Sequence, residues 1–560
     1  MADRLISAAA SKDPDVRGRR PVHDVSREAP STAFSRSDLE ERVKLVPEER
    51  LQLTSEDEQQ PKRSGSSLLV PLALAALCTG LVACAAVSLL ALFRPLPAAP
   101  KVTCAAAGAS RGPMPAGANF GGWLVLEDWF FSGQDGRYVT SADPQGQGAC
   151  LPPLARGTLA RWPSEGVLAS RLNKTYGRRK AVDIISAHRH SYIGEHDLAL
   201  LADLGIHQVR LPLTWAAFAD ALAPLSAEAY GSHNATTDTT LVPDPFHVGN
   251  VTMTTVPRGW LGQFLRRAGK HGLRVVFDMH SMPGGSSDGT YNGVWPHEPA
   301  FWTANAVLGG GAFPLRTVGL WVVAALIGWI ESLDKEARTV VSGITVMNEP
   351  AHMAASLGFA EEREVLSWIE AAADLFRQSS LPKQGLKLYV NMIETGFMDF
   401  WGTVGPWWHN VFSKAEREKW AVFDVHWYTA WDGGRCDGRV LPGGGYLCDA
   451  PLAEARRLLR GCARGFTEVF ASHIHGLKSC SEFSTGTFAD AVLACNDRTL
   501  LQAFLEEQVS VFQSAEVESF FWTWRMPYGP SFQMGWSLKH LLGHEDAFLQ
   551  SPCSLPLGVM

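Results

Sequence analysis

The apolar residues of this 560-residue chain are unevenly distributed, and their pattern divides the chain into segments. Residues 1–67 mix both charges without a regular apolar spacing, which is typical of a disordered tail. Leu68–Phe93 is apolar and contains no charged residue, and 94–116 is rich in Pro, Ala and Gly, as expected of a linker. Residues 117–545 alternate between two kinds of apolar pattern and predict a folded domain, followed by a short tail over 546–560.

The uncharged segment Leu68–Phe93 predicts a transmembrane helix. At about 1.5 Å per residue it is long enough to cross a hydrocarbon core of about 30 Å. A cleaved signal peptide would have a shorter apolar stretch and a much shorter preceding segment than residues 1–67. We therefore expect one membrane anchor, and the chain would contact the membrane through this helix.

The orientation of the anchor follows from what lies after it. Lys and Arg flank both sides, so the positive-inside rule gives no clear answer. Three N-glycosylation sequons begin at Asn173, Asn234 and Asn250, all beyond the anchor. They favour a single-pass type II protein with a cytoplasmic tail and an extracellular or lumenal domain, at the plasma membrane or in the secretory pathway.

The cysteines agree with this topology without fixing any pairing. Cys78 and Cys84 lie in the predicted anchor, and eight more are outside it: Cys104, Cys150, Cys436, Cys448, Cys462, Cys480, Cys495 and Cys553. An even number in an oxidising compartment is consistent with disulfides, but eight cysteines allow 105 pairings. Scattered reduced thiols are the alternative.

Short β-like runs alternate with helical patterns across the folded domain. The runs are Asn119–Val125, Gln208–Leu213, Leu273–His280, Ile344–Glu349, Leu388–Ile393, Val422–Tyr428, Leu477–Phe483 and Ser519–Arg525. The helical stretches are Gly194–Leu204, Gly259–Gly272, Leu320–Ser332, Glu361–Ser379, Leu452–Ser472 and Leu500–Ser514. Strands that alternate with helices indicate a parallel sheet, and eight of them predict an α/β fold, a closed (β/α)8 TIM barrel. An open doubly wound sheet is the rival, although no Gly-rich phosphate loop follows the first run.

The ends of these predicted strands carry chemically active side chains, and the active site of a (β/α)8 barrel lies at those ends. The side chains are Arg210, His280, Asn348, Glu349, His426, Tyr428, Glu482 and Trp522. Two carboxylates with imidazoles and aromatic rings form a glycosidase-like set. A retaining glycosidase needs two carboxyl groups about 5–5.5 Å apart, one as nucleophile and one as acid/base. The Asn before Glu349 suits a hydrogen bond to a sugar 2-hydroxyl.

Composition and the remaining motifs exclude other classes. A net charge of −7 gives no basic footprint for nucleic acid. The pair His188 and His190 lacks the further ligands of a zinc site. Gly285–Gly289 matches G-x-S-x-G, but no helix follows it as a nucleophile elbow requires. We therefore expect no metal and no cofactor, while the oligomeric state is not indicated.

The order of the motifs resembles that of glycoside hydrolase family 5, in its exo-β-1,3-glucanase subgroup, in a membrane-anchored form. The similar segments are Asn119–Trp129, Val209–Pro212, Asp278–His280, the Asn292 loop, Met347–Pro350, His426–Tyr428, Ser481–Ser484 and Phe521–Arg525. The resemblance covers about residues 117–545. It implies a (β/α)8 barrel with Glu349 as acid/base and Glu482 as nucleophile.

The resemblance also implies the surroundings of these two carboxylates. Arg210 would orient the nucleophile, Trp522 would stack beneath the sugar, and Trp431 would be an aromatic residue at the entrance. The residues that would bind the glucosyl unit in the −1 subsite are Glu127, His280, Asn292, Asn348, His426 and Tyr428.

Four departures from the family pattern concern the substrate. Ser481 and Phe483 flank the nucleophile where the family usually has Gly and Trp, and Ser281 replaces a glycine. Arg525 ends a motif that usually ends in Lys, and residues 219–256 form an apparent insertion. Both catalytic carboxylates are retained.

The expected activity is hydrolysis of terminal β-glucosyl units of β-1,3-glucan by a retaining double displacement, with transglucosylation when a sugar replaces water. One alternative keeps the enzyme class but acts on β-1,6-glucan or on steryl or other lipid glucosides. Another is a catalytically weak barrel that binds glucan at the cell surface. The released product discriminates among them.

Overall fold

The computed structural model describes the barrel and leaves the N-terminal segments outside. The described residues are 112–127, 130, 164–287, 289–350, 360–394, 400–428, 451–486, 497–526 and 535–544. The expected tail over 1–67, the expected anchor Leu68–Phe93, most of the linker and the C-terminal tail lie outside these residues, as does Trp431. Disorder, membrane anchoring and the entrance role of Trp431 therefore stay predictions.

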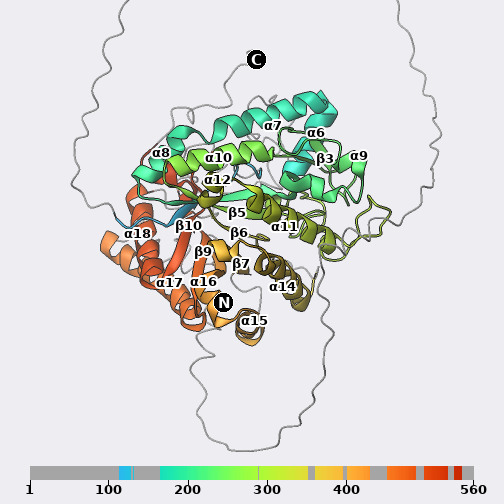
Figure 1. Cartoon of the computed structure of the whole chain (residues 1–560). Helices are drawn as coiled ribbons and strands as arrows, with labels where there is room; N and C mark the ends of the chain where they lie inside the picture. The colour runs from blue at the N-terminus through green and yellow to red at the C-terminus, as the bar shows by residue number, and fades with distance from the viewer. Residues whose placement is uncertain are drawn as a thin grey trace, which may run out of the picture. The chain divides into compact units, whose positions relative to one another are not determined.

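Eight parallel strands form a closed barrel in the order β1-β10-β9-β8-β7-β6-β5-β2 (Figure 1). The strands are β1 (Gly117–Asn119), β2 (Gln208–Thr214), β5 (Arg274–Ser281), β6 (Val341–Thr345), β7 (Lys387–Glu394), β8 (Ala421–Trp427), β9 (Leu477–Phe483) and β10 (Val517–Phe521). Helices cover the outside of the barrel. The predicted (β/α)8 fold is confirmed, and the open-sheet alternative is wrong.

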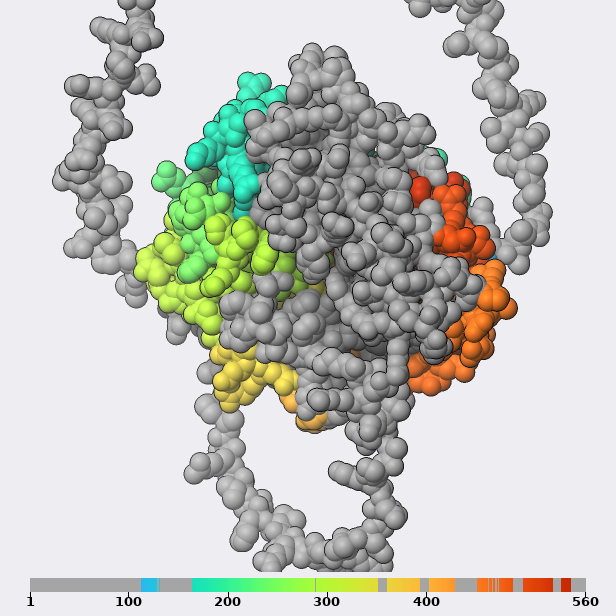
Figure 2. Space-filling view, turned by 180° about the vertical axis from the view of Figure 1, so that it is seen from behind, coloured from blue at the N-terminus to red at the C-terminus, as the bar shows by residue number. Residues whose placement is uncertain are grey.

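Six helices match the predicted helical stretches to within a few residues, the largest difference being the start of α11. They are α8 (Glu195–Asp203), α10 (Arg258–Lys270), α11 (Leu315–Ser332), α14 (Glu362–Gln378), α17 (Leu452–His473) and α18 (Arg498–Ser514). In the space-filling view, the orange surface of α17 lies at the opposite side from the cyan and green helices (Figure 2). Among the described residues, α11 is the one helix long and apolar enough to span a membrane, but half of that window is buried inside the protein.

Further helices complete the outer layer. They are α6 (Glu165–Tyr176), α7 (Arg178–Tyr192), α9 (Ala227–Tyr230), α12 (Lys335–Val340), α15 (Gly405–Val411), α16 (Lys414–Lys419) and α19 (Leu538–Leu541). Helices α6 and α7 precede β2 and pack against each other. Helix α6 also contacts β4 (Thr252–Thr254), so this pair of helices covers the segment between β2 and α10.

Three predicted strand boundaries are wrong, all at strand ends near the site. Strand β1 ends at Asn119, because Gly122 (φ 70°) turns the chain and Trp123 then packs into the core against Phe264. Strand β6 ends at Thr345 and β10 at Phe521, so the residues that follow leave the sheet. Apolar residues in these segments are buried in turns, and a strand pattern cannot distinguish the two.

The insertion predicted over 219–256 forms a small layer of its own. It contains α9 and an antiparallel pair, β3 (Leu241–Pro243) and β4 (Thr252–Thr254). The side chains of Asn234 and Asn250 are exposed on this layer, whereas Asn173 is half-buried in α6. Two of the three sequons therefore present an accessible asparagine.

Register shifts occur at the carboxyl ends of several strands. One additional residue is inserted in β5 at His280, in β7 at Met392 and in β9 at Ser481. A β-bulge leaves the additional residue unpaired and changes the direction of its side chain. Because these bulges meet at one end of the barrel, they direct polar side chains toward a common point.

The structure describes one of the eight cysteines outside the predicted anchor. Cys480 is a free thiol, completely buried in β9. The side chains of the other seven lie outside the described part of the chain, so disulfides among them stay a prediction.

Candidate active site

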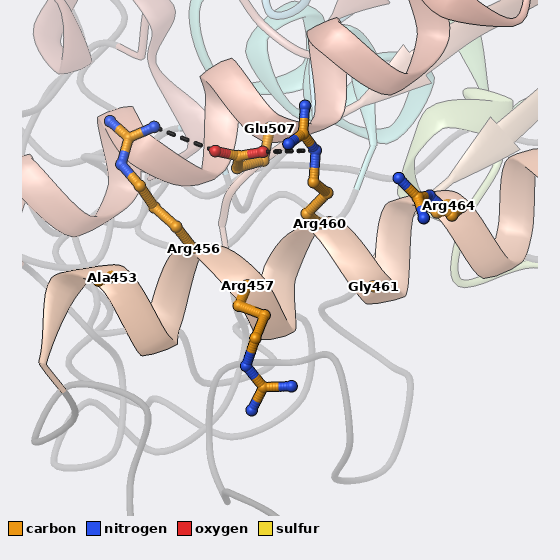
Figure 3. A pocket seen from close by; sticks show the side chains of 7 residues that line it. All are labelled: Ala453, Arg456, Arg457, Arg460, Gly461, Arg464 and Glu507. Carbon is orange, nitrogen blue, oxygen red and sulfur yellow. Dashed lines mark hydrogen bonds and ion pairs between the residues drawn. The ribbon is translucent and has the colours of Figure 1, made fainter.

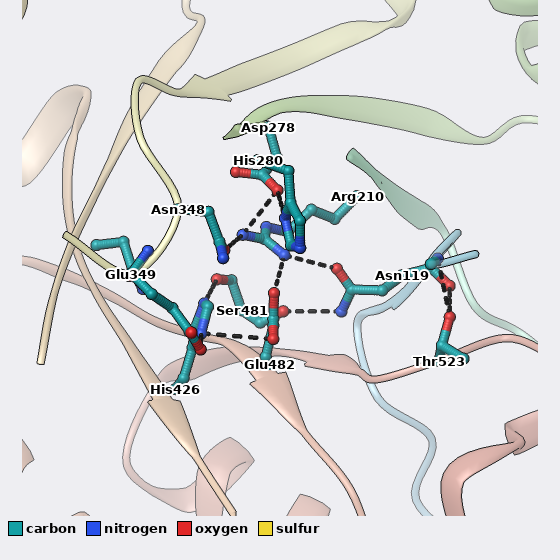
Figure 4. Close-up of polar contacts among 12 residues, drawn as sticks. Asn119, Arg210, Asp278, His280, Asn348, Glu349, His426, Ser481, Glu482 and Thr523 are labelled. Carbon is teal, nitrogen blue, oxygen red and sulfur yellow. Dashed lines mark hydrogen bonds and ion pairs between the residues drawn. The ribbon is translucent and has the colours of Figure 1, made fainter. Parts of the chain in front are cut away.

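Glu349 and Glu482 meet at the carboxyl end of the barrel (Figure 4). Glu349 follows β6 and Glu482 lies in β9, and they are only 6% and 4% exposed. One oxygen of each carboxylate and one nitrogen of His426 all lie within 4.8 Å of one another. This separation is near the 5–5.5 Å of retaining glycosidases and well below the 6.5–9.5 Å of inverting ones.

The backbone at Glu349 has an uncommon conformation. Its φ is 45°, in the left-handed region that residues other than Gly seldom adopt. The Glu349 amide donates to Oδ1 of Asn391, 2.9 Å away, which holds this conformation from the neighbouring strand. Strained backbone of this kind is typical of functional sites and is maintained by surrounding contacts.

Both oxygens of Glu482 accept hydrogen bonds. Nη1 of Arg210 is 2.5 Å from Oε1, and the hydroxyl of Tyr428 donates to Oε2 at 2.6 Å. The carboxylate is therefore fixed in one orientation by donors from β2 and from the end of β8.

Arg210 connects this carboxylate to three more side chains. Its guanidinium donates to Oδ1 of Asn119 at 3.0 Å and of Asn348 at 2.8 Å, and it pairs with Asp278 at 3.0 Å. Burial lowers the pKa of Arg210, but Asp278 and Glu482 outweigh burial and raise it above the ordinary value. A permanent positive charge thus lies between strands β2, β5 and β9.

Tyr428 is a neutral donor. Burial raises the pKa of its phenol well above the usual value, and the carboxylates of Glu482 and Glu349 raise it further. The proton therefore stays on the phenol oxygen, and Tyr428 can hold the nucleophile without becoming an anion.

His426 lies between the two carboxylates. Its Nδ1 is 2.6 Å from Oε1 of Glu349 and 3.4 Å from Oε2 of Glu482, and its Nε2 is 3.1 Å from the hydroxyl of Ser481. Burial lowers the pKa of the imidazole, but the two carboxylates outweigh it, so the net effect is a raised pKa.

Among the described residues, Glu349, His426 and Glu482 form the one cluster close enough to hold a metal ion together. A histidine ligand must present an unprotonated nitrogen to the metal, with the other nitrogen hydrogen-bonded. Here Nδ1 contacts Glu349 and Nε2 contacts Ser481, so both ring nitrogens are already in use. The arrangement suits proton sharing between the side chains better than metal binding.

A second imidazole and an indole ring form one wall of the site. His280 contacts Oδ2 of Asp278 through Nδ1 at 2.6 Å, and its ring stacks on Trp522 with 5.4 Å between centroids and 4° between planes. Burial lowers the pKa of His280, but Asp278 outweighs it and the pKa is raised. A cis peptide bond joins Trp522 to Thr523.

Glu127 and Asn292 are held by the loop that follows β5. Oε2 of Glu127 accepts from the hydroxyl of Thr290 at 2.9 Å. The amide of Asn292 bonds inside its own loop: Oδ1 accepts from Val294 and Trp295, and Nδ2 donates to the carbonyl of Ser287. The structure therefore assigns the Asn292 side chain a loop-shaping contact, while its sugar-binding role stays a prediction.

Two residues in this network did not stand out in the sequence. Asn391 and Asp424 lie at register partners on β7 and β8, and both are buried. Nδ2 of Asn391 donates to Oδ2 of Asp424 at 3.0 Å. A polar residue inside an apolar strand is a usable signal, because a buried polar group requires partners.

A separate concavity lies on the outer helices and not at the barrel mouth (Figure 3). Four arginines of α17 and Glu507 of α18 line it: Arg456, Arg457, Arg460 and Arg464. Glu507 pairs with Arg456 and Arg460, and Arg457 points away from it. This surface contains no pair of carboxylates and is not the candidate active site.

Comparisons with known proteins give relatives that share a name. No family model matches the chain. The chain is 23% identical over 450 residues to the probable glucan 1,3-beta-glucosidase A of Emericella nidulans, covering 76% of this chain and 88% of that protein. It is 24% identical over 457 residues to the protein of the same name from Aspergillus niger, covering 77% and 86%. Among solved structures, the rutinosidase of Aspergillus niger is similar with a TM-score of 0.47 and 15% identity, covering 77% and 97%.

Proposed function

We propose that this chain, a glycoside hydrolase related to the glucan 1,3-beta-glucosidases, removes terminal β-glucosyl units from β-1,3-glucan with retention of configuration. Two curated relatives that bear this name align over about three quarters of the chain. The single observation that carries retention is the short distance between Glu349 and Glu482, within 4.8 Å at their nearest oxygens.

The reaction proceeds in two steps. Glu482 attacks the anomeric carbon of the terminal glucosyl unit, and Glu349 donates a proton to the departing oxygen, giving a covalent glycosyl-enzyme. A water molecule then attacks the same carbon while Glu349 accepts its proton, and glucose leaves with the original configuration. A sugar hydroxyl in place of water gives transglucosylation.

The surrounding side chains have defined roles in this proposal. Arg210 and Tyr428 hold Glu482 by the two hydrogen bonds to its oxygens. Oδ1 of Asn348 accepts from Arg210, which turns its NH2 group toward the 2-hydroxyl of the sugar. Trp522 supports the ring, and Glu127, His280, Asn292, His426 and Trp431 complete the sugar-binding surface.

We also propose that this domain acts outside the cytoplasm on a membrane anchor. The proposal rests on the uncharged segment Leu68–Phe93 and on the exposed asparagines of the sequons at 234 and 250. In a eukaryotic host, Asn234→Gln and Asn250→Gln should each remove one glycan, seen as a mass difference that enzymatic deglycosylation abolishes. A wild-type chain without glycans would contradict this orientation.

The test uses the full-length chain with a laminarin-type β-1,3-glucan, following products over time and their anomeric form at release. We expect β-glucose as the sole early product. Glu482→Gln and Glu349→Gln should each lower activity by at least about 1,000-fold, because each removes a group that takes part in bond making. Glu336→Gln, on the exposed face of α12, is the matched control and should be as active as the wild type.

Other outcomes would redirect the proposal. Longer oligosaccharides as first products would contradict exo action. Glucose released from β-1,6-glucan or from a lipid glucoside, and not from laminarin, would change the substrate. If the folded protein cleaves none of these substrates but binds glucan, the chain is a glucan-binding protein and not an enzyme.

A further inference from the structure

A closed ring of hydrogen bonds runs from the carboxylate of Glu349 back to its backbone amide through the side chains of His426, Ser481, Asp424 and Asn391. Its carboxylate contacts Nδ1 of His426, whose Nε2 contacts the hydroxyl of Ser481. That hydroxyl donates to Asp424 at 2.6 Å, Asn391 donates to the same oxygen, and Oδ1 of Asn391 accepts from the Glu349 amide. The ring therefore holds the side chain and the backbone of Glu349 together.

Ser481 enters this ring because of the bulge in β9. Val425 pairs with Cys480 and His426 pairs with Glu482, so Ser481 is the additional residue between them. Its carbonyl, freed from the ladder, accepts from Nδ2 of Asn119 at 2.8 Å. The bulge thus places Ser481 and Glu482, adjacent in sequence, in one polar network.

The direction of the hydrogen bonds follows from Asp424. Three donors converge on this buried carboxylate: the amide of Ser481 at 2.9 Å, its hydroxyl at 2.6 Å and the amide of Asn391 at 3.0 Å. An ionised Asp424 satisfies all three donors at once and has no proton of its own to give to Ser481. Since a serine hydroxyl has one proton, and Ser481 gives it to Asp424, the oxygen of Ser481 must accept from Nε2–H of His426.

With Nε2 of His426 protonated, only the protonation of Nδ1 can change. It either accepts a proton from neutral Glu349 or donates one to the Glu349 carboxylate. In both arrangements the pair of Glu349 and His426 holds a single exchangeable proton at Nδ1···Oε1. This is the proton that the first step of the proposed mechanism consumes.

We propose that Ser481 is a positioning residue that keeps this proton on the Glu349–His426 pair at higher pH than the pair alone would allow. Its hydroxyl donates to the Asp424 carboxylate and accepts from Nε2–H of His426, so the ionised Asp424 favours the protonated imidazole. The inference rests on the proposed function for its catalytic consequence, and on geometry alone for the location of the proton. A glycine at this position, as in the family pattern, cannot make this connection.

The charges around His426 support the direction of the effect. Glu349 from the segment after β6, Glu482 from β9 and Asp424 from its own strand are acidic and favour a protonated ring, whereas Arg210 from β2 opposes it. The phenol of Tyr428 stays neutral because burial and the two glutamates raise its pKa. Burial raises the pKa of Asp424, with His426 and Arg210 opposing, so the connection weakens only once that carboxyl is protonated.

The experiment compares Ser481→Ala and Ser481→Gly with the wild type in the full-length chain. The pair must be protonated for the first step, so the alkaline limb of kcat/KM should move to lower pH by about one pH unit in both variants. The acidic limb should not move. A role confined to packing would lower kcat/KM equally at every pH.

Ser479→Ala is the matched control. Ser479 lies in the same strand, is equally buried, and its hydroxyl has no hydrogen-bond partner in the described part of the chain. Its pH profile should be that of the wild type. An alkaline limb that stays at the wild-type pH in both Ser481 variants would overturn the proposal while leaving the glycosidase function intact.

A second measurement does not depend on activity. In a chain labelled with 15N-histidine, the signals of His426 are assigned by their loss in His426→Gln. We expect its imidazole to lose a proton at lower pH in Ser481→Ala than in the wild type. Identical titrations would overturn the proposal, and different titrations in a chain that cleaves no glucan would support it although the proposed function had failed.

Discussion

Two buried tyrosines each donate a hydrogen bond to a glutamate, at opposite ends of the barrel strands. Tyr428 donates to Glu482 and Tyr389 donates to Glu518, both at 2.6 Å. Tyr428 lies just beyond the end of β8, beside the candidate nucleophile. Glu518 lies at the start of β10, where Lys387 also reaches it at 3.3 Å. The phenol of Tyr428 therefore lies at the carboxyl end of the strands, in the candidate site, and that of Tyr389 contacts a group at their amino end.

Tyr428→Phe should lower kcat/KM on the glucan about 10- to 100-fold, because a hydrogen bond to a charged group contributes about 1.5–3 kcal/mol. The phenyl ring keeps its packing, so the melting temperature should change little. Steady-state kinetics on the full-length chain provides the measurement.

Tyr389→Phe is the matched control for this substitution. It removes a hydrogen bond of the same length from a buried phenol, and should lower stability by about 1 kcal/mol with kcat/KM unchanged. Equal losses of activity in both variants would contradict the assignment of Tyr428 to the nucleophile.

At the scale of elements, helix α7 anchors the two chain segments that end near the site. Nε2 of His188 contacts the carbonyl of Gly122 at 2.8 Å, and the indole of Trp123 donates to the carbonyl of Arg189 at 2.7 Å. The hydroxyl of Tyr192 donates to the carbonyl of Arg525 at 2.9 Å. One face of α7 thus holds the turn after β1 and the segment after β10.

His188 makes this anchor sensitive to acid. Burial lowers its pKa to about 3, with Arg189 and Arg525 adding to the effect and the carbonyl of Gly122 opposing it. The pKa of His188 is 6.5 in the unfolded chain and about 3 in the folded chain. At a pH between these values the unfolded chain binds a proton that the folded chain does not. Stability is therefore complete above pH 6.5 and is lost as the pH falls.

His188→Gln keeps a donor for Gly122 but cannot titrate. We expect the difference in free energy of unfolding between pH 7 and pH 4 to be about 3 kcal/mol smaller than in the wild type, measured by urea denaturation. His190→Gln, on the exposed side of the same helix, should preserve the wild-type difference. An unchanged difference in His188→Gln would contradict a buried neutral imidazole.

The elements themselves were largely predictable, and the exceptions have physical causes. Long apolar periods gave α10, α14 and the body of each buried strand. The turn after β1 resembled a strand because Trp123 and its apolar neighbours pack into the core without pairing. The pair β3 and β4 was missed because strands of three residues have too few positions to show alternation.

The site was predictable in its residues but not in its connections. The order of motifs along the chain predicted that Glu349 and Glu482 lie close together, because strand ends converge in a barrel. The contact of Ser481 with Asp424 depends on a bulge that shifts β9 by one residue, and the bulge has no signature in the sequence. Asn292 bonds to its own loop, and only the fold of that loop shows this.

At the scale of the whole molecule, a buried ion pair joins α8, which precedes β2, to α19, which follows β10. Nζ of Lys539 donates to Oδ1 of Asp197 at 2.8 Å, and the indole of Trp524 donates to the same oxygen at 2.9 Å. Burial raises the pKa of Asp197, but Lys539 and the other donors outweigh it and the net pKa is lowered. The contact joins α8, α19 and the segment after β10.

Asp197→Asn should lower the free energy of unfolding by about 3–5 kcal/mol, because it removes the charged partner of Lys539 from a buried ion pair. Thermal unfolding of the full-length chain measures the loss. Glu418→Gln breaks an exposed pair with Lys414 on α16 and should cost less than about 1 kcal/mol. Similar losses in the two variants would mean that the buried Asp197 pair contributes no more to stability than an exposed one.

Alkylation of the free thiol of Cys480 in β9 can measure how often the barrel opens. Burial raises the pKa of Cys480 well above the usual value, and Asp424 and Glu482 raise it further, so the folded chain presents neither access nor a thiolate to an alkylating reagent. Modification must wait until β9 separates from its neighbours. The rate at which the peptide containing Cys480 gains mass under native conditions therefore measures how often β9 is exposed, without denaturant and without substrate.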